Sequence, residues 1–186
     1  MTWLNALPHP IVALATTSPT TALICKMKLL VLLTALSVAN LAYSLELGDQ
    51  APDFELTTLG EDKSLSLSSF HGKVVFLDFW ASWCPPCLIS IPEYAAWARE
   101  IESEDFVILT INLDKKTKKA LHFLKKHPVP YAVLWDASGG VAQKYKIPSM
   151  PTSYIIDQDG RVSYIHKGFK AGDLELIKEE VKRALK

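Results

Sequence analysis

Two cysteines three residues apart are the residues of this chain best suited to chemistry. They enclose two prolines in the sequence Cys84-Pro85-Pro86-Cys87, directly after an apolar run and before a helical pattern. We therefore expect the motif at the N-terminus of a helix, where the helix dipole and unpaired backbone N–H groups stabilise a thiolate. Two thiols at this spacing can close a disulfide and reopen it. The first lies at the helix end and is the more exposed nucleophile, so we predict that Cys84 attacks and Cys87 resolves.

Three other uses of such a cysteine pair fit the sequence less well. A zinc site needs about four ligands, and one such motif supplies only two. Covalent haem attachment needs a histidine directly after the second cysteine, where this chain has Leu88. A purely structural disulfide across so short a loop would constrain the unfolded chain very little. We therefore expect neither a metal nor a cofactor.

A buried strand and an amphipathic helix are expected on the two sides of the motif. Residues 74–80 are apolar at six of seven positions, which predicts a central strand buried on both faces. From residue 87 to 101, apolar residues recur at helical spacing, and Pro92 should kink this helix. Asp78 lies inside the strand, and a buried carboxylate there would have a raised pKa, which suits proton transfer near neutral pH. An Asp at the strand end that turns to solvent is the alternative.

The rest of the pattern alternates strands with helices and predicts an α/β domain. Turn residues divide residues 45–70 into short apolar stretches, which suggests an N-terminal hairpin. Further strands are expected at residues 106–113, 131–135, 153–156 and 162–166, and further helices at residues 115–126, 141–145 and 174–185.

Lysines gather on the helix expected at residues 115–126. They are Lys115, Lys116, Lys118, Lys119, Lys125 and Lys126. Charge runs of this kind usually face solvent, which is our interpretation, and docking of an acidic partner is the alternative. The histidines show no ligand spacing and are assigned no role: His71, His122, His127 and His166.

Composition and the N-terminal segment indicate a globular domain behind an export signal. Of 186 residues, 49% are hydrophobic and 22% charged, with 20 basic and 20 acidic side chains, which disfavours a disordered chain and a nucleic-acid partner. Residues 29–39 are apolar and uncharged, too few to span a membrane, and a small-x-small cleavage pattern follows at residues 42–44. We predict that residues 1–44 are a signal peptide, or an over-called start plus a signal that begins at Met27. An uncleaved N-terminal anchor is the alternative, and residues 45–186 form the exported domain.

The segment VVFLDFWASWCPPC closely resembles the active-site segment of the thioredoxin superfamily. Pro92 stands where thioredoxins keep a helix proline, residues 145–152 resemble the segment with the cis-proline that faces the motif, and Gly168 resembles the glycine of the last strand. The resemblance covers nearly all of residues 45–186. It implies a thioredoxin fold with a central mixed β-sheet flanked by helices, an N-terminal hairpin extension and a central helix–strand insertion at residues 115–135.

The opening segment LGDQAPDFELTTLG, the insertion and the export signal are similar to the TlpA/ResA/CcmG-type branch and its redoxin, or AhpC/TSA-like, domain. The resemblance implies a monomeric thiol-disulfide oxidoreductase in the periplasm or another extracytoplasmic space, either free or membrane-anchored. It would reduce disulfide-containing proteins and be recharged by a membrane electron donor of the DsbD/CcdA kind. ResA-like reductants often carry Glu between the cysteines, and CcmG-like ones carry an acidic residue near the cis-proline. This chain has Pro85 and Met150 there, so a role in cytochrome c maturation is not implied.

The resemblance also implies roles for individual residues. Asp78, six residues before Cys84, matches the buried carboxylate that moves a proton to and from the second cysteine. Thioredoxins place a lysine near this carboxylate, and the corresponding position here is Thr110, so the role would rest on burial alone.

Substrate contacts are expected around the motif. If the bond before Pro151 is cis, the preceding backbone can pair with an extended substrate segment beside Cys84, and Met150 would add a flexible apolar contact. A trans proline in an ordinary loop is the alternative. Trp83 is expected on the exposed rim, in contact with substrate, and Trp80 in the core.

Pro85 bears on the direction of the reaction. It lacks an N–H, so one potential donor to the Cys84 thiolate is missing, and a less stabilised thiolate favours the disulfide form and a more reducing potential. Three other functions stay open: a disulfide oxidant or isomerase, a thiol peroxidase, and a module that binds a client or a metal without turnover. The peroxidase is disfavoured because its signature needs proline and threonine where this chain has Leu77 and Ala81.

Overall fold

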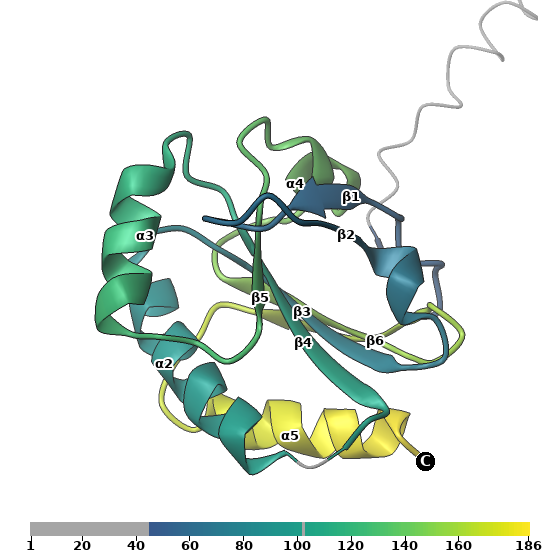
Figure 1. Ribbon diagram of the computed structural model, residues 1–186. Helices are drawn as coiled ribbons and strands as arrows, with labels where there is room; N and C mark the ends of the chain where they lie inside the picture. The colour runs from purple at the N-terminus through teal and green to yellow at the C-terminus, as the bar shows by residue number, and fades with distance from the viewer. Residues whose placement is uncertain (1–44, 102) are drawn as a thin grey trace, which may run out of the picture. The chain divides into compact units, whose positions relative to one another are not determined.

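A five-stranded mixed sheet forms the centre of the domain (Figure 1). The structure is a computed structural model that describes residues 45–101 and 103–186, so the predicted signal segment lies outside the described residues. The strand order is β5-β4-β3-β6-β7. The strands are β3 (Val74–Trp80), β4 (Phe106–Asn112), β5 (Ala132–Trp135), β6 (Thr152–Ile156) and β7 (Val162–Lys167). β3, β4 and β5 are parallel, whereas β6 is antiparallel to both β3 and β7, which confirms the predicted mixed sheet.

The central strand β3 separates two hydrophobic cores. All seven of its residues are buried, as the apolar run predicted. Because side chains of a strand alternate between faces, Phe76 and Trp80 enter one core and Leu77 and Phe79 the other. Asp78 belongs by this alternation to the face of Phe76 and Trp80.

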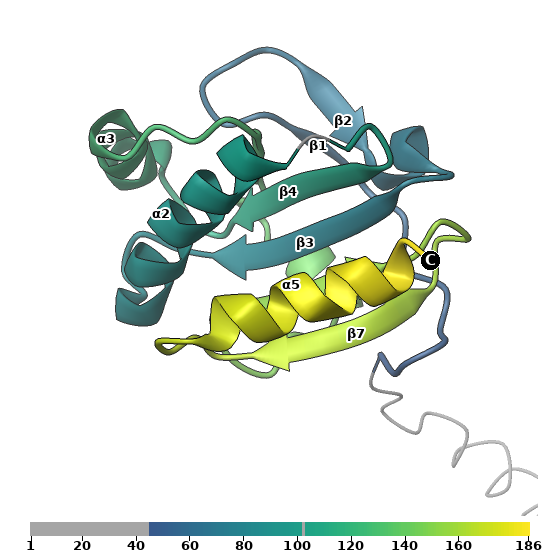
Figure 2. The same ribbon diagram turned by 90° about the horizontal axis from the view of Figure 1, so that it is seen from below.

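Helices cover both faces of the sheet. They are α2 (Pro85–Glu100), α3 (Thr117–Lys126), α4 (Gly140–Lys144) and α5 (Asp173–Ala184), with a short 3-10 helix η1 (Leu67–Phe70). Helices α2 and α5 lie together over one face (Figure 2) and share a core with Trp80 and both motif cysteines. The other core contains residues of α4, η1 and the N-terminal extension. Pro92 lies inside α2, as expected.

The two additions expected around the sheet are present. β1 (Glu55–Thr57) and β2 (Ser64–Ser66) form the predicted antiparallel hairpin, and Thr58 bridges to Leu134 on the edge strand β5. Helix α3 and β5 form the predicted helix–strand insertion. Helix α3 begins at Thr117 rather than at residue 115, because the backbone of Lys116 is still extended. Among the described residues, no helix is both long and apolar enough to cross a membrane.

Candidate active site

The two motif cysteines form a disulfide at the start of α2. Their Sγ atoms are 2.09 Å apart. Cys84 is the N-cap residue of the helix and is 4% exposed, whereas Cys87 is fully buried, so the predicted nucleophile is the more exposed of the pair. Pro85 and Pro86 occupy the first two helical positions and have no N–H. The N–H of Cys87 is therefore the first one available in the helix, and it donates to the Cys84 sulfur at 3.4 Å.

The loop before the motif is fixed by Asp114, which follows β4. The backbone N–H and the hydroxyl of Ser82 each donate to the Asp114 carboxylate at 3.0 Å. The Asn112 side chain donates to the same carboxylate at 2.9 Å, and the Trp135 indole donates to the Asp114 carbonyl at 2.7 Å. No motif or spacing in the sequence singles out Asp114. The carboxyl ends of neighbouring parallel strands meet at one edge, so a carboxylate after β4 could have been placed beside the motif after β3.

Asp78 is fully buried below the motif, which confirms the predicted burial and excludes the solvent-facing alternative. Burial raises the pKa of its carboxyl from 3.8 to about 8. The Ser153 hydroxyl donates to Asp78 Oδ1 at 2.7 Å and lowers this pKa, so it offsets part of the effect of burial. The group can therefore exchange a proton close to neutral pH.

Polar side chains form a row across the sheet at the level of Asp78. In the strand register, Asp78 lies beside Thr110 on β4 and beside Ser153 on β6, and Ser153 lies beside His166 on β7. Thr110 is the position where the resemblance expected a lysine. Within residues 45–101 and 103–186, the buried atoms Asp78 Oδ2, Thr110 Oγ1 and Tyr94 Oη have no hydrogen-bond partner. One oxygen of the Asp78 carboxyl is therefore held by Ser153, and the other is open to a proton.

His166, the member of this row on the edge strand β7, contacts helix α5. His166 Nε2 lies 3.0 Å from Asp173 Oδ2, and the Lys170 N–H donates to the same oxygen at 2.9 Å. No role was expected for His166, because no motif spacing along the chain links it to Asp173. The structure gives it a contact between β7 and the first turn of α5.

The loop before β6 contains a cis peptide bond between Met150 and Pro151, as the resemblance implied. The Pro151 carbonyl accepts the Gly168 N–H at 2.8 Å. Met150 is half-buried and packs against the core cluster that contains both motif cysteines. This loop therefore borders the core in which both motif cysteines lie.

The two tryptophans before the motif differ as predicted. Trp83 is 64% exposed, which places it on the rim. Trp80 is fully buried, with its ring centroid 5.8 Å from that of Phe123 on α3. Contact of Trp83 with substrate stays a prediction.

Comparison with known proteins is consistent with this geometry. The AhpC/TSA family matches residues 47–165. The thiol-disulfide oxidoreductase ResA of Bacillus thuringiensis is 32% identical over 142 residues, which cover 76% of this chain and 78% of the relative. The crystal structure of a putative thiol:disulfide interchange protein DsbE from Chlorobium tepidum superposes with a TM-score of 0.73 at 38% identity, over 77% of this chain and 100% of that one. An exposed lipoprotein thioredoxin from Streptococcus pneumoniae gives a TM-score of 0.59 at 34% identity, over 69% and 99% of the two chains.

Proposed function

The chain belongs to the AhpC/TSA family and is a thiol-disulfide oxidoreductase, and we propose that its Cys84–Cys87 pair reduces disulfides of exported proteins. The observation that carries the proposal is the Cys84–Cys87 disulfide at the N-terminus of α2, with Asp78 buried on the same side of the sheet. A dithiol at this position can donate two electrons to a substrate disulfide, and it is then oxidised to the disulfide that the structure contains.

The reaction takes two exchange steps. The Cys84 thiolate attacks one sulfur of the substrate disulfide, the substrate S–S bond breaks, and the other substrate sulfur leaves as a thiolate. The Cys87 thiolate then attacks the Cys84 sulfur of the mixed disulfide and releases the second substrate sulfur. The substrate gains two electrons, and the enzyme loses two as the Cys84–Cys87 disulfide forms.

Asp78 is the group that takes the proton of Cys87 before the second step. A cysteine thiol has an ordinary pKa of about 8.5. The Asp78 carboxyl, with a pKa of about 8, is close to this value. It is protonated in most molecules at pH 7, and the ionised fraction, which grows toward pH 8, takes the proton of Cys87 at low cost. Oδ2, which no described group hydrogen-bonds, is the accepting oxygen.

The prolines of the motif favour the reducing direction. With no N–H on Pro85 or Pro86, the Cys84 sulfur receives one backbone donor in the first helical turn, from Cys87. Fewer donors leave the thiolate less stabilised and shift the pair toward the disulfide.

The reduction potential tests this direction. It is measured on the full chain in dithiothreitol and glutathione buffers, with the fluorescence of the buried Trp80 as the readout. We expect a value near or below about −270 mV, the potential of thioredoxin. A value toward about −120 mV would make the protein a disulfide donor and overturn the argument from the prolines.

Substrate, location and electron supply follow from the same proposal. An extended substrate segment pairs with the backbone before Pro151 and contacts Met150 and Trp83. The chain is exported as a monomer by residues 1–44, and residues 45–186 form the working domain. A membrane dithiol donor of the DsbD/CcdA kind returns the two electrons. The likeness to an exposed lipoprotein thioredoxin supports this location. N-terminal sequencing of the protein from a cell-envelope fraction tests the proposed export, because a chain processed there should begin at residue 45.

A further inference from the structure

A groove runs beside the redox motif and has α3 as its basic wall. Its volume is about 840 Å³. Ser82 and Leu88, on the two sides of the cysteine pair in sequence, line one side of it. Four lysines of α3 line the other: Lys118, Lys119, Lys125 and Lys126. We call this feature the α3 groove.

The lysines of the α3 groove are exposed and are not neutralised by their own helix. Residues 117–126 contain no acidic side chain, and none lines the groove. The ion pairs found in the described part of the chain include no lysine of α3. The positive charge is therefore available to a partner.

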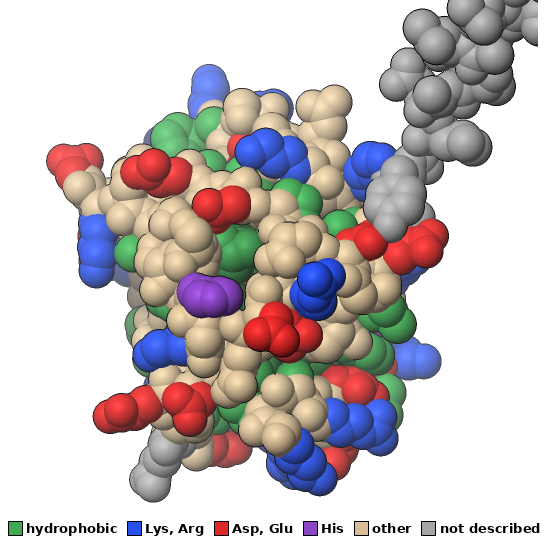
Figure 3. All heavy atoms as spheres, turned by 90° about the vertical axis from the view of Figure 1, so that its right-hand side faces the viewer, with side chains coloured by type: hydrophobic (Ala, Val, Ile, Leu, Met, Phe, Trp, Pro, Cys, Tyr) green, Lys and Arg blue, Asp and Glu red, His purple; other side chains and the backbone are tan. Residues whose placement is uncertain are grey.

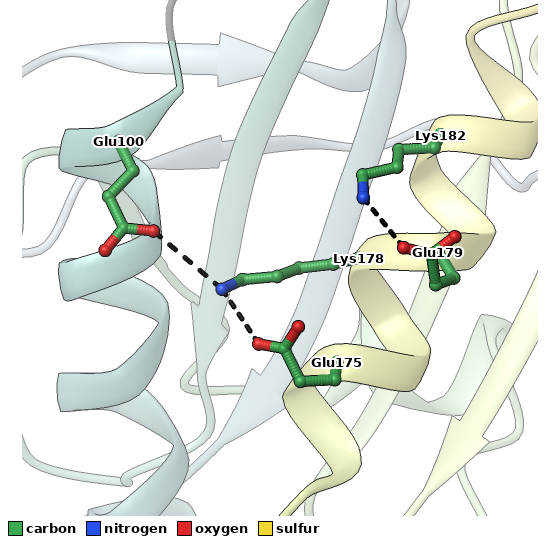
Figure 4. Close-up of polar contacts among 5 residues, drawn as sticks. All are labelled: Glu100, Glu175, Lys178, Glu179 and Lys182. Atoms are coloured by element: carbon green, nitrogen blue, oxygen red, sulfur yellow. Dashed lines mark hydrogen bonds and ion pairs between the residues drawn. The ribbon is translucent and has the colours of Figure 1, made fainter.

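Helix α5 is a helix of this domain in which acidic side chains balance the basic ones. Lys178 lies 3.0 Å from Glu175 and 3.8 Å from Glu100, and Lys182 lies 2.7 Å from Glu179 (Figure 4). The face drawn in Figure 3, on the other side of the domain from α3, also carries acidic and basic side chains close together. The chain as a whole has 20 basic and 20 acidic residues. The charge of α3 is thus local and is not a consequence of a basic composition.

We propose that the α3 groove binds an acidic, partly apolar segment of the protein whose disulfide Cys84 reduces. The inference rests on the proposed function and adds the chemistry of the substrate. Besides the lysines, the groove offers the apolar side chains Leu88, Leu121 and Phe123. A concave site with an apolar surface and charged edges fits an extended chain better than the flat surface of an anionic membrane.

The position of the groove explains why it would act on redox exchange in particular. Its lining reaches to within two residues of Cys84 on one side and to the residue after Cys87 on the other. A segment held there keeps its disulfide close to the attacking sulfur. Exposed charges act mainly on the association rate, and salt screens them over about 10 Å at 0.1 M, so the effect should weaken as ionic strength rises.

The test uses the full chain and two synthetic disulfide peptides that differ only in the residues flanking the cystine, Asp and Glu in one and Asn and Gln in the other. We expect kcat/KM at low salt to be about tenfold higher for the acidic peptide. The preference should disappear as salt approaches about 0.5 M, a measurement that needs no variant.

Two matched variants locate the effect. The variant K118Q/K119Q/K125Q/K126Q should lose the preference for the acidic peptide. The control K178Q/K182Q/R183Q/K186Q removes the same charge from α5 and the residues after it and should keep the preference. Equal loss in both variants would make the effect one of net charge and overturn the inference.

Other outcomes distinguish a failure of the α3 groove proposal from a failure of the proposed reductase function. If the wild-type protein reduces both peptides equally at every salt concentration, the α3 groove has no such role while the reductase stands. If it reduces neither, the proposed function fails. If it shows no peptide preference but binds phosphatidylglycerol vesicles through the α3 lysines, the groove faces a membrane and the inference is overturned.

Discussion

The Cys84–Cys87 disulfide has an interior side and a surface side, and they are built differently. On the interior side, Asp78 and Ser153 are buried in neighbouring strands, and their hydrogen bond is fixed by the register of the sheet. On the surface side, Trp83 and the α3 groove are exposed, and the groove is lined by long flexible lysines. The difference indicates a division of labour. The interior side sets the pKa of the group that exchanges a proton with Cys87, and the surface side selects the protein partner.

Substitution of either cysteine should lower the rate of disulfide reduction more than any other change, because the cysteines carry out the exchange itself. Cys84→Ser removes the attacking sulfur and should lower insulin reduction by at least about 10³-fold. Cys87→Ser leaves the attack but removes the resolving thiolate, so a mixed disulfide with substrate should accumulate and be visible on non-reducing gels. Peroxide turnover that survives in the Cys87→Ser variant would instead support the thiol peroxidase.

Asp78→Asn tests the interior side most directly. It removes the proton acceptor of the second step while keeping an oxygen that can accept from Ser153. We expect disulfide reduction at pH 7 to fall by about 10²-fold, with the first attack by Cys84 less affected. Stopped-flow measurement of mixed-disulfide formation and of its resolution separates the two steps. An equal loss in both steps would mean that Asp78 does not act on Cys87.

The same variant should be more stable than the wild type in a defined pH window. The folded Asp78 carboxyl keeps its proton up to about pH 8, whereas the unfolded one releases it near pH 3.8. Unfolding therefore releases a proton between these values, and the wild-type free energy of unfolding falls as pH rises through the window. The amide of the variant does not titrate, so Asp78→Asn should gain up to roughly 4 kcal/mol at pH 7 and little at pH 4. Urea unfolding of the disulfide forms at both pH values measures this.

Ser153→Ala and Thr110→Val compare the two neighbours of Asp78. Loss of the Ser153 hydroxyl should raise the pKa of Asp78 further and move the pH–rate profile upward by about one unit, because a hydrogen bond to a charged group is lost. Thr110→Val removes a hydroxyl that has no partner among the described residues, so it should leave the profile in place and the stability unchanged or higher. A shift of equal size in both variants would contradict the assignment to Ser153.

The sequence was most informative about the interior side. The apolar run of β3, with Asp78 inside it, predicted both the burial of that carboxyl and its raised pKa, and the motif position predicted the start of α2. Those features depend on local pattern, which one chain contains in full. The residues that were missed depend on pairing between distant segments.

Ser153 and Asp114 show why such residues escape a sequence. Ser153 donates to Asp78 from a neighbouring antiparallel strand, 75 positions away in the sequence. Ser82 donates to Asp114, 32 positions away. The family resemblance supplied the order of the elements without their register, and a shift of one residue would turn Ser153 to the other face. On α3, the sequence showed the lysines, but only the structure shows that they line a groove beside the motif.

Trp83→Ala should have the smallest effect and tests the surface side. The side chain is 64% exposed, so its removal leaves the buried contacts of Asp78 and of the disulfide in place. The reduction potential should therefore stay close to the wild-type value. The kcat/KM for a protein disulfide should fall by less than about tenfold, mainly through KM, because one exposed contact of an interface is lost. Trp80→Phe, which alters a fully buried ring three residues earlier, is the contrasting variant and should lower stability instead. A changed potential in Trp83→Ala would show that the surface side also sets the chemistry, and the division of labour between the two sides would not hold.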